Sequence, residues 1–306
     1  MITAAAVSPS LDVTYLVESL AGIQRPLSVH RVAGGKALNA ARAAAALGSP
    51  VGAVAVLGGG TGAVVADLVQ ASGLSLRVVD GLELTRTCVS VHARSSGELT
   101  EIYEHATPVS DDVFASFLTV LGVELAARPG WCLISGGFPA SLGPAALRSV
   151  VAVAASAGAR VAVDSHGPVL RALLATGVDL LKVNRAEACE VLAVPPATPL
   201  ADVVDALHAL TGRLVVVTDG VAGLRATDGS RTLTAVLPDV RGQFPVGSGD
   251  SVLGALVHAL DGGRDLDDAL RLATAVGCAN ALVPGAARFD PATARALASD
   301  VVVRAV

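Results

Sequence analysis

Residues 131–164, WCLISGGFPASLGPAALRSVVAVAASAGARVAVD, hold the pattern that decides the fold. Two short β-rich runs, Trp131–Ser135 and Arg160–Asp164, flank an Ala/Leu-rich amphipathic stretch that predicts a helix beginning near Gly143. A strand, a crossover helix and a second strand in this order are typical of a parallel sheet covered by helices. The stretch therefore predicts an α/β fold.

The same alternation extends over most of the chain. Further strands are expected at Ile2–Val7, Val51–Leu57, Asp179–Val183 and Leu214–Thr218, and further helices near Lys36, Gly62, Pro168, Arg185 and Leu200. Residues 224–237 have the pattern of a hairpin, and apolar helices from Asp250 and Asp265 are expected to run to the end of the chain. We predict one domain, residues 1–306, with three α/β/α layers around a mostly parallel sheet.

Two segments, at about residues 12–33 and 86–104, break this rhythm. In the second, TCVSVHA at residues 87–93 alternates apolar and polar side chains before a Ser-Gly-Glu turn and another extended run. Alternation gives a strand one dry and one wet face. We therefore expect these segments to form a small antiparallel sheet apart from the main one, acting as a lid.

Composition excludes several classes of protein. The chain has 306 residues, of which 52% are hydrophobic, so it can bury a large core and is not disordered. Its 22 Lys and Arg against 27 Asp and Glu, with 3% aromatic residues, predict no nucleic-acid partner. Glycines and Pro50 interrupt the longest uncharged run, residues 43–66, so no transmembrane segment is expected.

The beginning of the chain and its cysteines favour a cytoplasmic location. MITAAAVSPS carries no cationic patch ahead of an apolar core, unlike a secretion signal. Single cysteines without a CxxC pair or a nearby histidine ligand are expected to be reduced and buried; they are Cys88, Cys132, Cys189 and Cys278.

The sequence PVGSGDS at residues 245–251 leads into the apolar run VLGALVHAL. Glycines let backbone N–H groups converge, and the start of a helix adds partial positive charge, so this loop can hold a phosphoryl group. Asp250 at its rim can accept a proton from an attacking hydroxyl. The structural alternative is an ordinary glycine turn with Asp250 as the N-cap of the helix.

Two further motifs join a turn or strand end to a helix. GGKALN at residues 34–39 combines paired glycines with Lys36 and with Asn39, whose amide can bond a sugar hydroxyl. In KVNRAE at residues 182–187, Asn184 and Glu187 share a helical face and can hold water around Mg²⁺. The same spacing also fits a capping box without a metal, and spacing alone leaves both interpretations open.

A glycine run favours a different chemistry. GGGTGA at residues 58–63 follows an expected strand, opens an expected helix and matches G-x-G-x-x-A, with Asp80 after the next strand. This pattern resembles a dinucleotide fingerprint and supports a NAD(P)-dependent oxidoreductase as the lesser hypothesis. The fingerprint normally follows the first strand of a sheet and leaves Lys36, Asn184, Glu187 and Asp250 without a role.

Five motifs together resemble those of the ribokinase-like carbohydrate kinases of the phosphofructokinase B type. They occur in the family's order and spacing as GGKALNAARAAAALG near the start, SGGFPASLG at 135–143, KVNRAE at 182, VVTDGVAG at 216–223 and PVGSGDS near the end. SPSLDVTY, TRTCVSV and GELTEI are most similar to the 1-phosphofructokinase and tagatose-6-phosphate kinase branch. The resemblance implies an α/β/α domain with a small β-sheet lid, ATP and Mg²⁺ as cofactors, and a homodimer formed through the lid.

The resemblance also implies residue roles. Asp250 matches the catalytic base, and Gly247, Ser248 and Gly249 match the anion hole. Arg86 matches an arginine of the lid that can hold a substrate phosphate. The positions that match sugar contacts are Asp12, Gly34, Gly35, Lys36 and Asn39. Asn184 and Glu187 match the motif that is linked to Mg²⁺ through water, and the nucleotide-binding positions are Thr218, Gly220, Gly223 and Asn280.

The expected reaction is in-line transfer of the γ-phosphoryl group of ATP to a small sugar. Lys36 and Arg86 offer charge for a substrate phosphate, which favours fructose 1-phosphate, fructose 6-phosphate or tagatose 6-phosphate. The alternatives are a kinase of an unphosphorylated sugar or nucleoside and a catalytically silent sugar-binding relative. The chain departs from the family at Phe244-Pro245, which argues against monovalent-cation activation, and in TEIYEHA at residues 100–106, at Ser8 and at Asp219.

Overall fold

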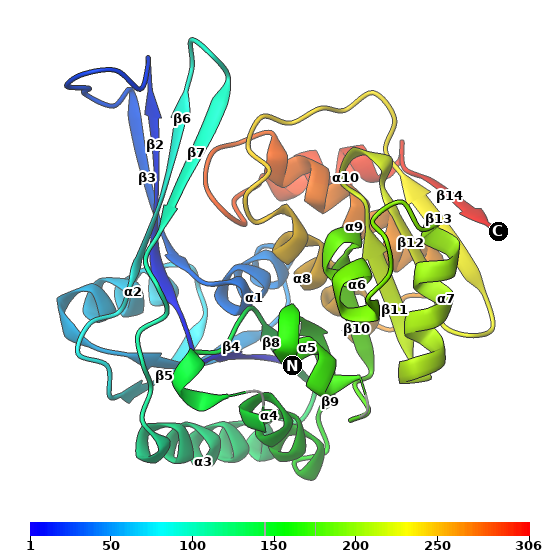
Figure 1. Ribbon diagram of the computed structural model, residues 1–306, viewed down its shortest axis with the longest axis horizontal. Coiled ribbons are helices and arrows are strands. Elements are labelled where there is room, and N and C mark those ends of the chain that lie inside the picture. The colour runs from blue at the N-terminus through cyan, green and yellow to red at the C-terminus, as the bar shows by residue number, and fades with distance from the viewer. Residues whose placement is uncertain (144, 175) are drawn as a thin grey trace.

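The computed structural model describes residues 1–143, 145–174 and 176–306. A ten-stranded sheet runs through the described chain (Figure 1). Its strands lie in the order β14 (Val302–Ala305), β13 (Thr232–Val236), β12 (Leu224–Thr227), β11 (Leu214–Thr218), β10 (Leu180–Asn184), β9 (Arg160–Asp164), β8 (Trp131–Ser135), β1 (Ile2–Ala6), β4 (Val51–Leu57) and β5 (Ser75–Asp80). Neighbours from β11 to β5 are parallel, and β12, β13 and β14 add an antiparallel edge.

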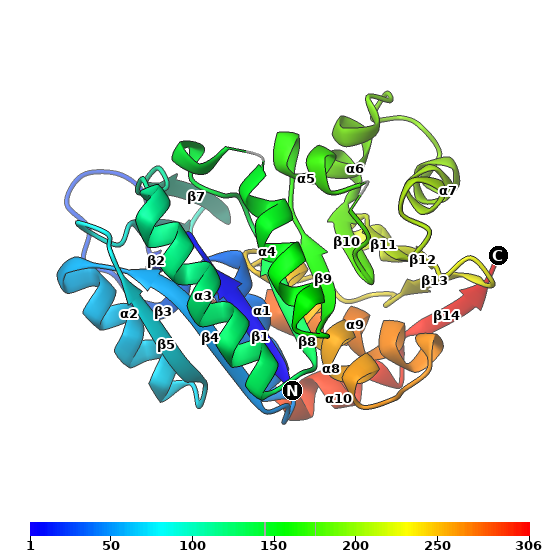
Figure 2. The same ribbon diagram turned by 90° about the horizontal axis from the view of Figure 1, so that it is seen from below.

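Helices cover both faces of this sheet, as Figure 2 shows with α5, α6 and α7 along the top of the view and α8, α9 and α10 along the bottom. One hydrophobic core packs against α1 (Lys36–Ala46), α2 (Gly59–Ala71), α8 (Ser248–Asp261), α9 (Leu266–Ala281) and α10 (Pro291–Ala298). The other packs against α3 (Asp111–Ala127), α4 (Ala145–Ser156), α5 (Gly167–Leu173), α6 (Arg185–Leu192) and α7 (Leu200–Thr211). Within the described residues, no helix combines the length and apolar character needed to cross a bilayer.

A second sheet stands away from the main body at the upper left of Figure 1. Its strands lie in the order β3 (Ser28–Gly34), β2 (Ser10–Val17), β6 (Thr87–Ala93) and β7 (Glu98–Tyr103), and we call this sheet the lid. The outer pairs are antiparallel, but β2 and β6 are parallel, so the prediction of a fully antiparallel lid is wrong. The reason is that β2 follows β1 and β6 follows β5, and both of these strands leave the main sheet at its carboxyl edge.

The predicted α/β architecture is confirmed, and most predicted elements begin within three residues of the observed ones. The prediction that apolar helices run to the end is wrong, because α10 leads into β14, which pairs with β13. Helix α3 was not predicted, although Ser110 caps it by accepting from the Val113 amide at 3.3 Å. All four cysteines are free thiols; three are buried and Cys278 is half-buried.

Helices α1 and α8 pack with their backbones in contact. A methyl group on Gly254 of α8 would lie 2.2 Å from the Ala40 carbonyl oxygen and 2.9 Å from the Ala43 Cβ of α1. Only a residue without a side chain fits between the helices at this distance. The contact brings the first turns of α1 and α8 to the same end of the sheet, where Lys36, Asn39 and Asp250 lie.

We predict that Gly254→Ala lowers the free energy of unfolding by about 1–3 kcal/mol, because the added methyl group must push the two helices apart. The matched control is Gly60→Ala in α2, where an added Cβ meets nothing within 4 Å. This exposed change should leave stability unchanged or raise it by up to about 1 kcal/mol. Urea denaturation of both variants measures the difference, and equal effects would contradict the packing argument.

Candidate active site

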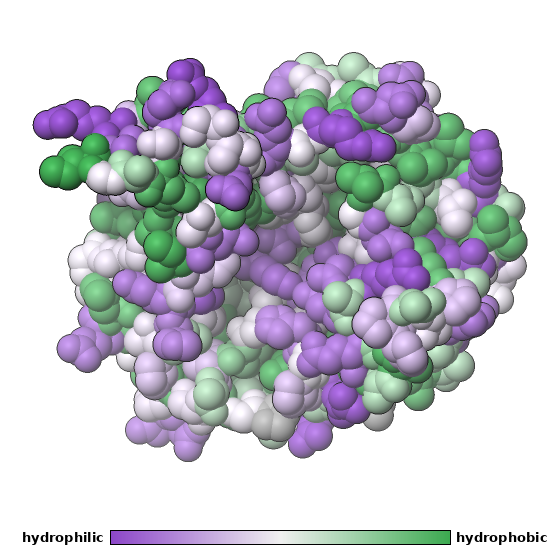
Figure 3. All heavy atoms as spheres, turned by 45° about the horizontal axis from the view of Figure 1, so that its top comes forward, coloured by the Kyte–Doolittle hydropathy of each residue, from purple (hydrophilic) through white to green (hydrophobic). Residues whose placement is uncertain are grey.

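A cleft of about 700 Å³ lies between the lid and the carboxyl ends of β8, β9, β10 and β11. Figure 3 shows it as a hollow lined mainly by hydrophilic residues near the middle of the molecule. Ligands of open α/β sheets bind at this edge, because the loops and helix starts that follow the strands converge there. Predicted residues on its wall are Asp12, Gly35, Lys36, Asn39, Arg86, Asn184, Glu187, Thr218, Gly220, Gly247, Ser248, Gly249 and Asp250.

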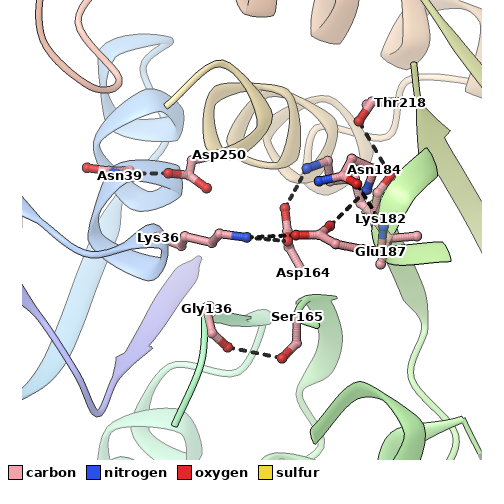
Figure 4. Close-up of polar contacts among 11 residues, drawn as sticks. Lys36, Asn39, Gly136, Asp164, Ser165, Lys182, Asn184, Glu187, Thr218 and Asp250 are labelled. Carbon is pink, nitrogen blue, oxygen red and sulfur yellow. Dashed lines mark hydrogen bonds and ion pairs between the residues drawn. The ribbon is translucent and has the colours of Figure 1, made fainter. Parts of the chain in front are cut away.

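Asp250 lies in the first turn of α8 and is only 6% exposed. Its Oδ2 accepts a hydrogen bond from Asn39 Nδ2 at 2.8 Å (Figure 4). Burial and the neighbouring Asp164 carboxylate raise the pKa of Asp250 to about 6, against the opposing effects of Lys36, Asn39 and Lys182. The carboxylate is therefore mostly ionised at neutral pH, while its conjugate acid is much weaker than an ordinary aspartic acid.

The helix start beside Asp250 is shaped by Gly247, which has φ +78°. A Cβ there would lie 2.7 Å from the Ala287 amide nitrogen, so both the dihedral and the space favour glycine. The first N–H groups of a helix have no intrahelical acceptor. The Ser248 amide donates to the Pro245 carbonyl oxygen at 3.0 Å, which leaves the amides of Gly249 and Asp250, two residues that line the cleft. This turn therefore has the backbone and the helix-start charge of an anion site.

Asn280 holds this turn from behind. Its amide nitrogen donates to the Val246 carbonyl oxygen at 2.9 Å and to Ser248 Oγ at 3.0 Å, and the residue has no exposed surface. Asn280 is not among the residues that line the cleft or the neighbouring cavity. Its position therefore fits support of the anion site, rather than the direct nucleotide contact that the resemblance implied.

Two lysines, Lys36 and Lys182, share one buried carboxylate. Asp164, at the end of β9, is 1% exposed and lies 3.4 Å from Lys36 Nζ and 2.5 Å from Lys182 Nζ (Figure 4). Burial alone would raise the pKa of Asp164, but the two ammonium groups outweigh burial and hold that pKa below its usual value. The pKa of Lys36 is raised, because Asp164, Glu187 and Asp250 outweigh the effect of its own burial. Asp164 and Lys36 are therefore charged at neutral pH.

Asn184 and Glu187 form the capping box of α6. Asn184 Oδ1 accepts from the Glu187 amide at 2.9 Å, and Glu187 Oε2 accepts from the Asn184 amide at 3.0 Å. The structural alternative for this spacing is therefore present. Glu187 also turns its second oxygen, Oε1, toward Lys36 Nζ at 3.2 Å, so its carboxylate faces the cleft as well.

The lid supplies the other end of the cleft. Asp12 accepts from Ser10 Oγ at 2.5 Å, and its carboxyl group occupies the space that a side chain at Gly34 would need. Arg86 donates to the Glu104 and Ser8 carbonyl oxygens at 3.2 and 3.3 Å. Its Nε is buried without a hydrogen-bond partner, and Nη1 and Nη2 each keep a second N–H group that these two hydrogen bonds do not use.

A second cavity of about 230 Å³ adjoins the anion site. Thr218, Gly220 and Gly223 lie on its wall, and most of the remaining lining is apolar. Thr274 also lines it, and its buried Oγ1 has no hydrogen-bond partner. The cavity shares Thr218, Gly220, Ser248 and Gly249 with the cleft, so one ligand can extend through both.

Asp164 and Lys182 are site residues that were not selected from the sequence. Each belongs to a short strand in which three of five residues are apolar, with Asp164 ending β9 and Lys182 in the middle of β10. A charged residue in or at the end of a buried parallel strand is a usable signal, because it must be paired or functional. Lysine is scarce in this chain, which made Lys182 noticeable in the sequence but did not indicate a function for it.

Within the glycine run at residues 58–62, Gly58 and Gly59 lie against the loop at residues 82–85, whereas Gly60 is open. A Cβ on Gly58 would lie 1.7 Å from the Leu82 carbonyl oxygen, and the Gly58 amide donates to Thr85 Oγ1 at 3.1 Å. The loop that contains Leu82 and Thr85 therefore covers the beginning of this turn and uses the Gly58 amide that a pyrophosphate would need. The geometry gives these glycines a packing role and does not favour the oxidoreductase hypothesis.

A three-layer α/β/α body, a separate lid sheet and a buried carboxylate at a glycine-shaped helix start are the features expected of a carbohydrate kinase. The family model described as pfkB family carbohydrate kinase matches residues 7–293. The chain belongs to this family, and it is a kinase.

Relatives span most of the chain. A 1-phosphofructokinase of Rhodobacter capsulatus is 34% identical over 253 residues, which cover 79% of this chain and 78% of that protein. The ATP-dependent 6-phosphofructokinase isozyme 2 of Escherichia coli (strain K12) is 31% identical over 258 residues, covering 82% of each chain. The crystal structure of phosphofructokinase-2 from Escherichia coli in complex with potassium superposes with a TM-score of 0.89 at 26% identity, covering 98% of each chain.

We predict that Asp250→Asn stabilises the fold above about pH 6. The folded-state pKa of about 6 lies above the ordinary value near 3.8, so the buried charge destabilises the native state once both states are ionised. Asparagine removes that cost and should raise the free energy of unfolding by about 2 kcal/mol at pH 8. Near pH 4 the two proteins should be alike. Urea denaturation at both pH values measures this, and equal differences at the two pH values would contradict the expected ionisation.

Proposed function

We propose that this kinase transfers the γ-phosphoryl group of ATP to a hydroxyl group of a phosphorylated ketohexose. The observation that carries the proposal is the meeting of Asp250, the amides of the anion site and Lys36 in one cleft. A base, an oxyanion-type site and a cation in one place are what phosphoryl transfer to an alcohol requires.

In the proposed reaction, Asp250 accepts the proton of the attacking hydroxyl. The O–H bond of the acceptor breaks, a bond forms from that oxygen to the γ-phosphorus, and the bond from the γ-phosphorus to the leaving ADP oxygen breaks. The amides of Gly249 and Asp250, in the first turn of α8, are the proposed donors that stabilise charge on the transferred group. A pKa near 6 makes Asp250 an ionised base at neutral pH that still binds a proton when the hydroxyl is close.

The residues of the cleft also fit Mg²⁺. Asp164 Oδ1 and Glu187 Oε1 converge on one cation, the Lys36 ammonium, at 3.4 and 3.2 Å. Among the described residues, no group of three or more acidic, histidine or cysteine side chains could hold a metal ion alone. Mg²⁺ is commonly bound by one or two carboxylates together with substrate phosphates and water.

We therefore propose that Glu187 and Asp164 hold the water shell of Mg²⁺, with Asn184 fixing Glu187 through the capping box. When bound, Mg²⁺ neutralises charge on the nucleotide phosphates. The apolar cavity next to Thr218, Gly220 and Gly223 is the proposed site of the nucleotide base.

Arg86 supports a phosphorylated acceptor. Arg86 lines the cleft, its Nη1 and Nη2 each keep one N–H group beyond the hydrogen bonds to Glu104 and Ser8, and arginine binds phosphate well. Both curated relatives are named as phosphofructokinases. Fructose 1-phosphate, fructose 6-phosphate and tagatose 6-phosphate are therefore the proposed substrates.

A second candidate is a kinase of an unphosphorylated sugar or nucleoside. Glu101 and Tyr103 of β7 line the same end of the cleft as Arg86, and the Tyr103 hydroxyl donates to the Glu101 carboxylate. A carboxylate beside Arg86 opposes a dianionic acceptor and suits the hydroxyl groups of a neutral one. The substrate comparison below separates the two candidates.

Asp250→Asn should lower kcat by about 10²–10⁴ because no other group at this position can accept the proton. ATP binding, measured by calorimetry, should change little. The matched control is Asp261→Asn at the far end of the same helix, where the carboxylate pairs with the N-terminus. A coupled assay of ADP release measures turnover, and retained activity of Asp250→Asn would refute its role as base.

Arg86→Ala should raise the KM for a phosphorylated ketohexose roughly 10- to 100-fold while leaving the KM for ATP nearly unchanged. The loss follows from removing a charged donor to the substrate phosphate. Arg94→Ala is the control, since Arg94 pairs with Glu18 on the exposed lid surface. If free sugars give the higher kcat/KM in the wild type, and Arg86→Ala affects them as little as ATP, the unphosphorylated-acceptor candidate holds instead.

A homodimer through the lid stays a prediction, as does the cytoplasmic location. Large apolar side chains support the dimer, because several on the lid are exposed: Leu20 (53%), Ile23 (94%), Leu27 (50%) and Ile102 (63%). Some of this apolar surface is visible in green at the left of Figure 3.

A further inference from the structure

Arg42 lies one turn after Asn39 on α1 and joins three parts of the chain. Its Nη1 donates to the carbonyl oxygen of Ala33 in β3 at 2.6 Å. Its Nη2 and Nε donate to the carbonyl oxygens of Ala286 and Ala287 at 2.7 and 3.3 Å. Nη2 also donates to Asn39 Oδ1 at 2.7 Å. No other side chain type offers this many donors in one plane.

The two carbonyl groups from residues 286 and 287 belong to the loop that backs the anion site. A Cβ on Gly247 would lie 2.8 Å from the Ala286 Cα and 2.7 Å from the Ala287 nitrogen. The turn that starts α8 therefore rests directly on this loop. By holding Ala286 and Ala287, Arg42 fixes the surface against which the anion site is built.

Asn39 has a different partner at each end of its amide. Its Nδ2 donates to Asp250 Oδ2 at 2.8 Å, and its Oδ1 accepts from Arg42 Nη2 at 2.7 Å. Rotating the amide by half a turn would place oxygen against the carboxylate and N–H groups against the guanidinium. Both contacts would be repulsive, so the arginine allows only the orientation that donates to Asp250.

We propose that Arg42 is a positioning residue for phosphoryl transfer, which turns the Asn39 amide toward Asp250 and braces the loop behind the anion site. Arg42 is not itself on the wall of the cleft. The inference rests on the proposed function, in which Asp250 is the base.

The charges that face Asp250 determine what loss of Arg42 does. They are Lys36 from α1, Asp164 from the end of β9 and Lys182 from β10, with Arg42 behind Asn39. Removing Arg42 takes away one positive charge and frees the Asn39 amide to turn its oxygen toward the carboxylate. Both changes disfavour ionised Asp250, so the acid limb of the kcat profile moves to higher pH.

The experiment compares kcat from pH 5 to 9 for the wild type, Arg42→Met, Arg42→Lys and Arg288→Met. Arg288 is the matched control, because this nearby arginine contacts His30 and the Pro284 carbonyl oxygen and not Asn39. For Arg42→Met, the acid limb should move up by about one pH unit, so activity relative to the plateau falls roughly threefold at pH 6.5. Arg42→Lys keeps the charge but loses the planar set of guanidinium donors, so its acid limb should move by less than that of Arg42→Met. The acid limb of Arg288→Met should stay where it is in the wild type.

If Arg42 had a purely structural role, its loss would lower the kcat plateau without moving the acid limb of the pH profile. That result in both Arg42 variants would overturn the proposal. Asn39→Ala supplies a second readout that does not depend on how well one variant folds. In that background Arg42→Lys should no longer shift the limb; an unchanged shift also overturns the proposal. A wild-type kcat profile with no acid limb near pH 6 would instead refute Asp250 as the base. An acid limb that is present in the wild type but unmoved in the Arg42 variants would refute only the role of Arg42.

Discussion

The close packing of α1 on α8 is the constraint on which the rest of the site depends. Gly254 lets the backbones touch at Ala40, and this contact brings Asn39 to within 2.8 Å of Asp250. An aspartate that is 6% exposed would be costly without a donor at this position. Because the donor comes from the helix that also begins with Lys36, the same packing places the base and the cation of the cleft relative to each other. A change between these helices is therefore a change in the chemistry of the site.

Charge in the cleft is arranged in layers. Lys182 and Asp164 form the buried floor, and Lys36 lies above them between Asp164 and Glu187. Asp250 faces this group from α8. Its pKa is raised to about 6, whereas the pKa of Asp164 is lowered. Two carboxylates in one cleft thus have opposite tendencies, set by the number of ammonium groups that each one contacts. The separation suits Asp250 to proton transfer and keeps Asp164 charged at neutral pH.

Much of the fold could be predicted from sequence, because the buried parallel strands and the crossover helices have distinct periodicities. The motifs around Lys36, Asn184 and Asp250 were found because glycine turns and helix starts leave local signals. Asp164 was missed since its role comes from Lys36 and Lys182, which are distant in sequence. The parallel pairing of β2 with β6 was missed for a similar reason, because it depends on where the chain leaves the main sheet. The supporting position of Asn280 likewise appears only when α9 is placed behind the turn at Ser248.

The joint between the lid and the main body has a mechanical consequence. Strand β3 ends at Gly34 and α1 begins at Lys36, so Gly35, with φ +94°, alone separates the lid from the helix that carries the cleft lysine. Lys36 pairs with Asp164 of β9 and Glu187 of α6, both in the main body, whereas Asp12 belongs to the lid. Because β1 also leads into β2, β5 into β6 and β7 into α3, any rotation at Gly35 must be matched at these three other connections, and the lid carboxylate can then move relative to the ammonium group of Lys36 only by a concerted change at all four.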